Sequence, residues 1–289
     1  MGESNPAPTR RAMLGVSALL LSTPLHAADE GYNASGRSLA AMEKRLGLRI
    51  GVAALDTGNG NSIFYRESER FLMCSTFKVM LVAAVLTRVD AGKERLERVI
   101  RYQKSDLLEY APETSKNLAR GMSVGALCAA TVTLSDNTAA NLLFADIGGP
   151  PGLTSFARDL GDSRTRFDRT EGALNVPDGE RDTTVPSAML ANLRDILLGD
   201  TLSSASRKQL TDWMTGLSRL RAGLPAGWKA GDKTGSGAAG ALNDIAILWP
   251  PAGRAPVLVC AYTDGNRAGD APQDRALAEI GGIVAARFA

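Results

Sequence analysis

The spacing of apolar positions changes twice along the chain. Residues 48–56 and 62–65 are strand-like apolar runs separated by a turn rich in Gly and Asn. A short amphipathic helix is predicted before them at 39–46. From Ser75 to about Thr215 the apolar residues recur at helical spacing, which predicts helices over 75–90, 123–134, 138–147, 152–160, 186–198 and 203–216. Strand-like runs return at 230–236, 244–249 and 257–263, and a final helix is predicted over 271–288.

Strands at both ends of the chain, with helices between them, predict one sheet built from the two termini. The chain has 289 residues, 44% of them hydrophobic, and can therefore bury a sizeable core. We expect one unit over residues 28–289, made of two subdomains. The α/β subdomain would take about 36–70 and 217–289, and the all-helical subdomain about 71–216.

The first 27 residues have the composition of an export signal. Arg10 and Arg11 precede an apolar stretch, 12–21, that is too short to remain in a bilayer as an anchor, and small residues follow at Ala27 and Ala28. The segment 9–14 also suggests twin-arginine export. We therefore predict a signal peptide at 1–27, a periplasmic or secreted protein, and no membrane anchor in the mature chain.

Charge and composition exclude several functions. The formal net charge is +2 with no basic run, which argues against a nucleic-acid partner. The single histidine, His26, lies in the predicted signal, so the mature chain cannot use a Ser-His-Asp or Cys-His nucleophile or a histidine-bound zinc. Cys74, Cys128 and Cys260 lack metal-ligand spacing and are expected to be buried thiols, although a disulfide stays open at this point.

Ser75 and Lys78 are the first candidates for chemistry. They lie three residues apart before an apolar helical run, so both are expected on one face of a helix. Serine is a weak nucleophile without a base, and a buried lysine can become that base. Taken alone, the pair is better explained as a capped helix start with a snorkelling lysine.

Three further motifs follow in order. Ser135-Asp136-Asn137 opens a predicted helix, Lys233-Thr234-Gly235 begins a small-residue strand that continues into Ser236, and Glu171 stands between them with Asn175 four residues later. Together with Ser75 and Lys78, this set resembles the class A serine β-lactamases. The resemblance extends from about Gly36 to the C-terminus.

This resemblance implies a fold of mixed α and β structure (α/β, or α+β), an antiparallel five-stranded sheet flanked by helices beside an all-helical subdomain. It implies hydrolysis of the β-lactam amide of penicillins, and next of cephalosporins, through a serine acyl-enzyme, and so antibiotic resistance. No cofactor and no metal are expected. The expected partner is a small-molecule β-lactam, and the protein is expected to be a monomer.

The resemblance also assigns catalytic roles. Ser75 would attack the amide carbonyl, and either Lys78 or Glu171 acting through water would take its proton. Ser135 would pass a proton to the departing ring nitrogen. Glu171, with Asn175, would activate the water that releases the acyl group.

Further residues would bind the substrate. The backbone N–H groups of Ser75 and Ser236 would hold the oxyanion. Arg219, oriented by Asp274, would supply positive charge, although a solvated surface arginine is nearly as consistent with the sequence. Tyr110 would form a wall of the cleft, with an ordinary loop tyrosine as the alternative. The substrate-binding residues are therefore expected to be Asn137, Asn175, Lys233, Thr234, Gly235, Ser236, Tyr110 and Arg219.

The loop that carries Glu171 departs from its relatives. Asn141 is expected to brace it, and an Arg169–Asp182 ion pair to close its neck. Gly172 follows the glutamate where relatives often have proline, and the stretch 175–181 is two residues shorter than is typical. The effect of these departures on substrate range does not follow from the sequence. Some relatives pair the cysteine before the nucleophile with one after Lys-Thr-Gly, and here that position holds Gly237.

Two other classes of protein share some of these motifs. A penicillin-binding peptidase or transpeptidase has the serine, lysine and Lys-Thr-Gly motifs but normally lacks the glutamate with its asparagine. A β-lactam sensor domain acylates without turnover and usually hangs from transmembrane segments, and none follows the predicted signal. Glu171 and Asn175 therefore favour the hydrolase.

Overall fold

The computed structural model describes residues 1–2, 25–215, 218–265 and 271–289, with the backbone alone over 25–33. Most of the predicted signal peptide, 3–24, lies outside the described residues. None of the helices in the described ranges is both long and apolar enough to cross a bilayer.

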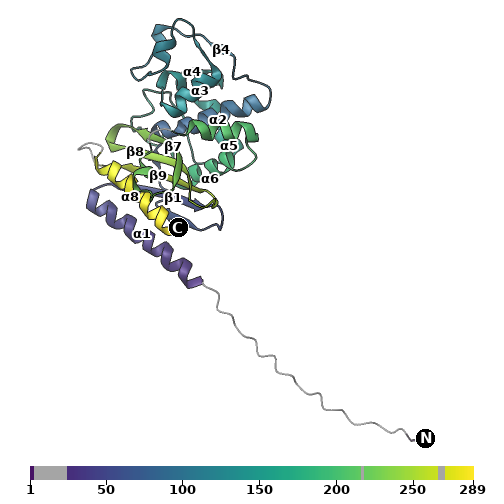
Figure 1. Cartoon of the computed structure of the whole chain (residues 1–289), viewed down its shortest axis with the longest axis vertical. Coiled ribbons are helices and arrows are strands. Elements are labelled where there is room, and N and C mark those ends of the chain that lie inside the picture. Colours follow the sequence, from purple (N-terminus) through teal and green to yellow (C-terminus); the bar gives the residue numbers. More distant parts are fainter. Residues whose placement is uncertain (3–24, 216–217, 266–270) are drawn as a thin grey trace.

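A five-stranded antiparallel sheet forms the centre of the α/β part, as predicted (Figure 1). Its order is β2-β1-β9-β8-β7, so strands from both ends of the chain pair in one sheet. β1 pairs with β9 along its whole length, from Arg49 opposite Asp264 to Asp56 opposite Val257. The strands are β1 (Arg49–Asp56), β2 (Ser62–Tyr65), β7 (Lys229–Ser236), β8 (Leu242–Trp249) and β9 (Val257–Asp264).

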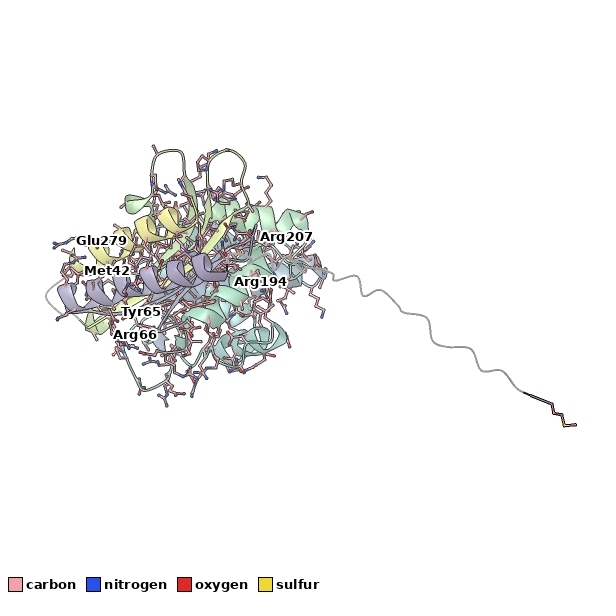
Figure 2. The ribbon with its side chains drawn as sticks, turned by 90° about the horizontal axis from the view of Figure 1, so that it is seen from below. Met42, Tyr65, Arg66, Arg194, Arg207 and Glu279 are labelled. Carbon is pink, nitrogen blue, oxygen red and sulfur yellow. The ribbon has the colours of Figure 1, made fainter. Side chains whose placement is uncertain are left out.

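Two helices from opposite ends of the chain, α1 (Leu25–Leu46) and α8 (Ala271–Arg287), cover one face of the sheet. They lie side by side, and Figure 2 shows Met42 and Glu279 on these helices close to Tyr65. Arg45 of α1 pairs with Glu279 of α8 at 2.5 Å, and the Tyr65 hydroxyl donates to Glu43 at 2.6 Å. A hydrophobic core that includes Leu39, Met42 and Ile280 fills the space against the sheet.

The other face of the sheet contacts α6 and merges with the helical part of the molecule. α2 (Phe77–Asp90) is its central helix, because residues 77–86 are all buried. Such a helix is apolar on every side, which is typical of a helix enclosed by others. The surrounding helices are α3 (Val124–Thr133), α4 (Asn137–Asp146), α5 (Gly149–Asp159), α6 (Pro186–Leu197) and α7 (Ser204–Trp213).

Several elements differ from the prediction. α1 begins at Leu25 and not at Leu39, so its first residues include Ala27, the end of the predicted signal, whose boundary stays a prediction. Two-residue strands form two small pairs, β3 (Phe71–Leu72) with β6 (Thr183–Thr184) and β4 (Val99–Ile100) with β5 (Met122–Ser123). A strand of two residues has no measurable period, and pattern analysis cannot detect it.

Candidate active site

Ser75 lies on a 3-10 turn, η1 (Cys74–Thr76), that runs directly into α2. Cys74 has a φ of +46°, a left-handed conformation that is uncommon for a residue with a side chain. The Asn243 amide, buried on β8, holds the strand before this turn by donating to the carbonyls of Leu72 and Met73 at 2.8 and 3.1 Å. The turn therefore has a fixed position between the sheet and α2.

Lys78, one turn after Ser75 at the start of α2, is completely buried and surrounded by oxygen atoms. Its Nζ lies 2.7 Å from Glu171 Oε1 and donates to Asn137 Oδ1 at 2.6 Å. It also reaches the carbonyl of Ser135 at 2.9 Å and the hydroxyl of the same residue at 3.2 Å. Lys78 thus brings the Ser135 and Glu171 motifs to the helix of Ser75.

Glu171 faces Ser75 from the loop 169–182, which we call the Glu171 loop. Its Oε1 accepts from the Ser75 hydroxyl at 3.4 Å, and its Oε2 accepts from Asn175 Nδ2 at 2.7 Å. Asn141 braces the backbone of the glutamate as predicted, with its Oδ1 accepting from the Glu171 N–H at 2.9 Å. Gly172 then takes a φ of +96°, a conformation that costs glycine little.

The predicted ion pair at the neck of the Glu171 loop is confirmed. Arg169 Nε and Asp182 Oδ2 are 2.6 Å apart. Asp182 is buried, and its Oδ1 also accepts from the backbone N–H groups of Asp168 and Arg169. A buried carboxylate with this many donors is well satisfied, which fixes the two ends of the loop together.

The second motif turns sharply at Ser135, whose φ is +60°. The next residue, Asp136, is fully buried and caps α4 by accepting from the Ala139 N–H. It also accepts from the backbone N–H groups of Glu113 and Thr114. Asp136 therefore holds the segment that follows Tyr110 against the site, a role that we did not predict.

β7 brings the third motif to the opposite side of Ser75. Gly235 allows this approach, because a Cβ there would lie 3.1 Å from the Ser75 nitrogen and 2.9 Å from the Met73 carbonyl oxygen. Lys233 is buried on the same strand, whereas Ser236 is exposed at its end.

Burial lowers the pKa of both lysines. For Lys233, burial and then the charge of Lys78 lower the pKa to about 7. For Lys78, burial lowers the pKa while the nearby Glu171 carboxylate opposes this shift. The two amines therefore disfavour each other's charge.

Arg219 reaches the end of β7, as the sequence suggested. Its Nε donates to Asp274 Oδ1 at 2.8 Å, and its terminal nitrogen donates to the Ser236 hydroxyl at 3.2 Å. Leu242, at the start of the neighbouring strand β8, is buried in the core. The guanidinium thus lies at the strand edge with a fixed orientation.

A cavity of about 390 Å³ lies beside these groups. Ser135, Lys233 and Thr234 line it, together with Tyr110, whose side chain is largely exposed at the rim. The cavity lies between the helical part and β7, beside the motifs that the sequence singled out. Among the described residues, no group of acidic, histidine or cysteine side chains is arranged to hold a metal ion.

The three cysteines are free and buried, as expected. Burial raises the pKa of each thiol, so none is a ready nucleophile. Gly237 lies against Cys74, because a Cβ at position 237 would be 2.5 Å from the Cys74 sulfur.

Comparison with known proteins agrees with this geometry. A profile of the Beta-lactamase enzyme family matches residues 36–288. β-Lactamase CTX-M-8 of Citrobacter amalonaticus is 46% identical over 253 residues, covering 86% of each chain. β-Lactamase L2 of Stenotrophomonas maltophilia is 45% identical and covers 85% of this chain and 83% of its own.

Solved structures give the same result. An ancestral class A β-lactamase (GNCA) superposes with a TM-score of 0.85 and 54% identity over 88% of this chain and all of its own. A putative class A β-lactamase, PenP, from Rhodopseudomonas palustris has a TM-score of 0.84 and 49% identity over 88% of this chain and 99% of its own.

The fold and the site together define a serine hydrolase with a buried lysine and an acidic loop residue beside the serine. The chain belongs to the β-lactamase family, as a class A serine β-lactamase. It therefore hydrolyses the β-lactam amide bond through a serine acyl-enzyme, an activity that confers antibiotic resistance.

Proposed function

We propose that Ser75 is the nucleophile and Glu171 its base. The observation that carries this proposal is the contact of 3.4 Å between the Ser75 hydroxyl and Glu171 Oε1, with Lys78 Nζ 2.7 Å from the same oxygen. A lysine amine has at most three protons to donate, and four oxygen acceptors surround Lys78. Burial lowers the pKa of Lys78, but the Glu171 carboxylate and these acceptors oppose the shift, and we infer that the lysine keeps its proton. The carboxylate of Glu171 is then left to accept the serine proton.

Ser135 then passes a proton to the ring nitrogen as the amide bond breaks. Its hydroxyl lies 3.2 Å from Lys78 Nζ, so the lysine can replace the proton that the hydroxyl gives away. Glu171, 2.7 Å from the same amine, then passes the proton it took from Ser75 to the lysine, which leaves the carboxylate ionised for the second half of the reaction. The negative oxygen formed at the carbonyl binds between the N–H groups of Ser75 and Ser236, next to the N-terminal end of α2.

Glu171 also acts in the second half of the reaction. Asn175 donates to Glu171 Oε2 at 2.7 Å, which fixes the carboxylate and leaves Oε1 turned toward Ser75. In this position the carboxylate deprotonates a water that attacks the acyl group on Ser75. The same base therefore serves both the formation and the hydrolysis of the acyl-enzyme.

We infer that the substrate carboxylate binds at the end of β7. Lys233 and Arg219 supply charge there, and the hydroxyls of Thr234 and Ser236 supply donors. Asn137 directs its Nδ2 to the amide of the substrate side chain, because its Oδ1 is engaged by Lys78. Penicillins fit this set first and cephalosporins next, with Tyr110 as the wall of the cleft.

We also propose that residues 1–27 are removed on export, which leaves a monomeric mature enzyme, residues 28–289, in the periplasm or outside the cell. The apolar stretch after Arg10 and Arg11 supports this proposal.

Steady turnover of nitrocefin by the purified protein tests the assignment. The wild-type protein should hydrolyse it continuously, and Ser75→Ala should lose activity while keeping its melting temperature. Glu97→Gln, at an exposed position away from the cavity, is the matched control and should keep full activity. A single stoichiometric burst in the wild type would instead identify an acylated sensor or peptidase.

A further inference from the structure

Two buried carboxyl groups lie beside the site: Asp232 on β7, which also borders the cavity, and Asp244 on β8. Asp232 is 2% exposed and Asp244 is 0% exposed. Neither residue takes part in the mechanism above. A buried carboxylate is costly unless its charge is balanced and its oxygens are hydrogen-bonded.

The strand register brings these two side chains to the same face of the sheet. Thr234 lies opposite Asp244, and Asp232 lies opposite Ala246. Side chains two residues apart on one strand share a face, so Asp232 and Asp244 are diagonal neighbours across the pair of strands. Ser218 lies close to both, since its hydroxyl donates to Asp244 Oδ2 at 3.4 Å and lowers the pKa of Asp232.

The two carboxyls differ in their partners. Asp244 Oδ2 accepts from the backbone N–H groups of Arg219 and Leu220 at 2.9 and 3.0 Å, at the start of the turn η4 (Leu220–Gly223). Its other oxygen, Oδ1, and both oxygens of Asp232 have no hydrogen-bond partner among the residues that the structure describes. Three buried oxygens of the pair thus lack a full hydrogen bond, since Ser218 stabilises the ionised form of Asp232 only weakly.

Nearby positive charge is too limited to balance two negative charges. The charged and titratable groups that face the pair are Lys233 on β7, Arg219 and Arg221 around η4, Lys78 beyond Lys233, and the Cys260 thiol on β9. The nearest guanidinium, Arg221, is 3.7 Å from Asp232 Oδ1 and is itself half exposed. Arg219 is already paired with Asp274.

We propose that Asp232 and Asp244 share one proton at neutral pH, so that the pair carries a single negative charge. Asp244 is the ionised member and positions Arg219 through the two backbone N–H groups. Asp232 is the protonated member and donates its hydrogen to the free oxygen of Asp244. This proton gives a hydrogen bond to one oxygen of Asp232 and to Oδ1 of Asp244, which are two of the three unpartnered oxygens. It also neutralises one of the two negative charges.

The direction of the pKa shifts agrees with this arrangement. Burial, and then the charge of Asp244, raise the pKa of Asp232 to about 8. Burial raises the pKa of Asp244 only to about 6, because the N–H groups of Leu220 and Arg219 stabilise its ionised form. Between these values the pair holds one proton, on Asp232.

The functional consequence rests on the proposed binding of the substrate carboxylate by Arg219 and Lys233. Asp244 holds the backbone from which the Arg219 side chain extends to Ser236. The single charge of the pair also raises the pKa of Lys233, and so opposes the burial that would neutralise this lysine. Asp232 and Asp244 are therefore positioning residues for the carboxylate site.

Infrared spectroscopy of the substrate-free protein tests the shared proton directly. The difference spectrum of the wild type between pH 7 and pH 9 should lose a carboxylic-acid C=O band as Asp232 ionises. The band should be missing from Asp232→Asn at pH 7 and present in Asp195→Asn, a surface control. A wild-type spectrum without this band at pH 7 would overturn the proposal, whatever the activity of the enzyme.

Stability and kinetics give a second test. The pKa of Asp232 is higher in the folded protein than in the unfolded chain, so its contribution to stability is lost as pH rises between about 4 and 8. The melting temperature of Asp232→Asn should therefore rise relative to that of the wild type over this range.

Asp244→Asn should raise the KM for benzylpenicillin roughly tenfold, with a smaller change in kcat. Asp232→Asn should raise this KM less. Equal effects of the two substitutions on KM would contradict the division of roles.

Discussion

Lys78 occupies a place in which every polar contact is an oxygen atom. Glu171, Asn137 and Ser135 surround its amine within 3.2 Å, and the side chain has no exposure to solvent. An ammonium group held in this way is both a structural link between three motifs and a proton carrier. Small changes at these residues are therefore expected to alter chemistry more than stability.

The contact of Arg219 with Ser236 leads to the first prediction. Arg219→Ala removes a charge-assisted donor at the proposed carboxylate site, so kcat/KM for benzylpenicillin should fall roughly 10- to 100-fold. Arg45→Ala, which breaks only the surface pair with Glu279, should leave kinetics unchanged. Unchanged penicillin turnover by Arg219→Ala would remove this residue from the site.

The lowered pKa of Lys233 predicts a pH dependence. Below about 7 the amine is protonated and attracts the substrate carboxylate, and above this value the charge is progressively lost. The KM for benzylpenicillin should therefore rise as pH increases from 7 to 9. Lys233→Arg, which stays charged throughout, should flatten this rise, and an identical profile for both proteins would argue against the assignment.

The sequence predicted the reactive residues, but not all of the residues that hold them in position. Ser75, Lys78 and Glu171 were found because their residue types and spacing indicate chemistry. Asn243 was missed, because an asparagine inside an apolar strand has no local signal. Its function arises only when β8 packs beside the Ser75 turn.

Among the elements, the segment that follows β7 contacts the Glu171 loop directly. The Ala238 N–H donates to the Asn175 carbonyl at 2.8 Å, and Gly237 fits between this carbonyl and Cys74. The helices and long strands were predictable from their periods. This contact was not, because it joins residues more than 60 positions apart in two irregular segments.

Gly237→Ala tests that contact. An added Cβ would lie 2.8 Å from the Asn175 carbonyl oxygen and 2.5 Å from the Cys74 sulfur, so the protein should lose about 1 to 3 kcal/mol of unfolding free energy. Gly36→Ala, in α1 with no atom near its added Cβ, is the control and should be neutral or slightly stabilising. Equal melting temperatures for both variants would contradict the tight packing.

The whole molecule is built around two cores on the two faces of its sheet. One lies between the sheet and the helices around α2, and the other beneath α1 and α8. Ser75, Lys78 and Glu171 lie on the side of the first core, whereas Arg219 lies beside α8 and the second core. The division into an α/β part and a helical part, at about 71 and 216, stays a prediction.

Met42→Ala tests whether the molecule can lose stability without losing activity. Met42 is buried in the second core, so its truncation should cost about 2 to 5 kcal/mol and lower the melting temperature by about 5 to 15 °C. The KM and kcat for nitrocefin at low temperature should not change. Glu279→Ala, at the surface of α8, should change neither property. A large kinetic effect of Met42→Ala would mean that the two cores are coupled.

The central claim is that the Glu171 carboxylate releases the acyl group from Ser75. Intact-protein mass spectrometry of Glu171→Gln after mixing with benzylpenicillin measures this most directly. The expected result is an adduct of one whole penicillin that forms slowly on Ser75, because the base for acylation is also lost, and then persists, with turnover slowed about 10²- to 10⁴-fold. Normal turnover with no adduct would contradict the claim.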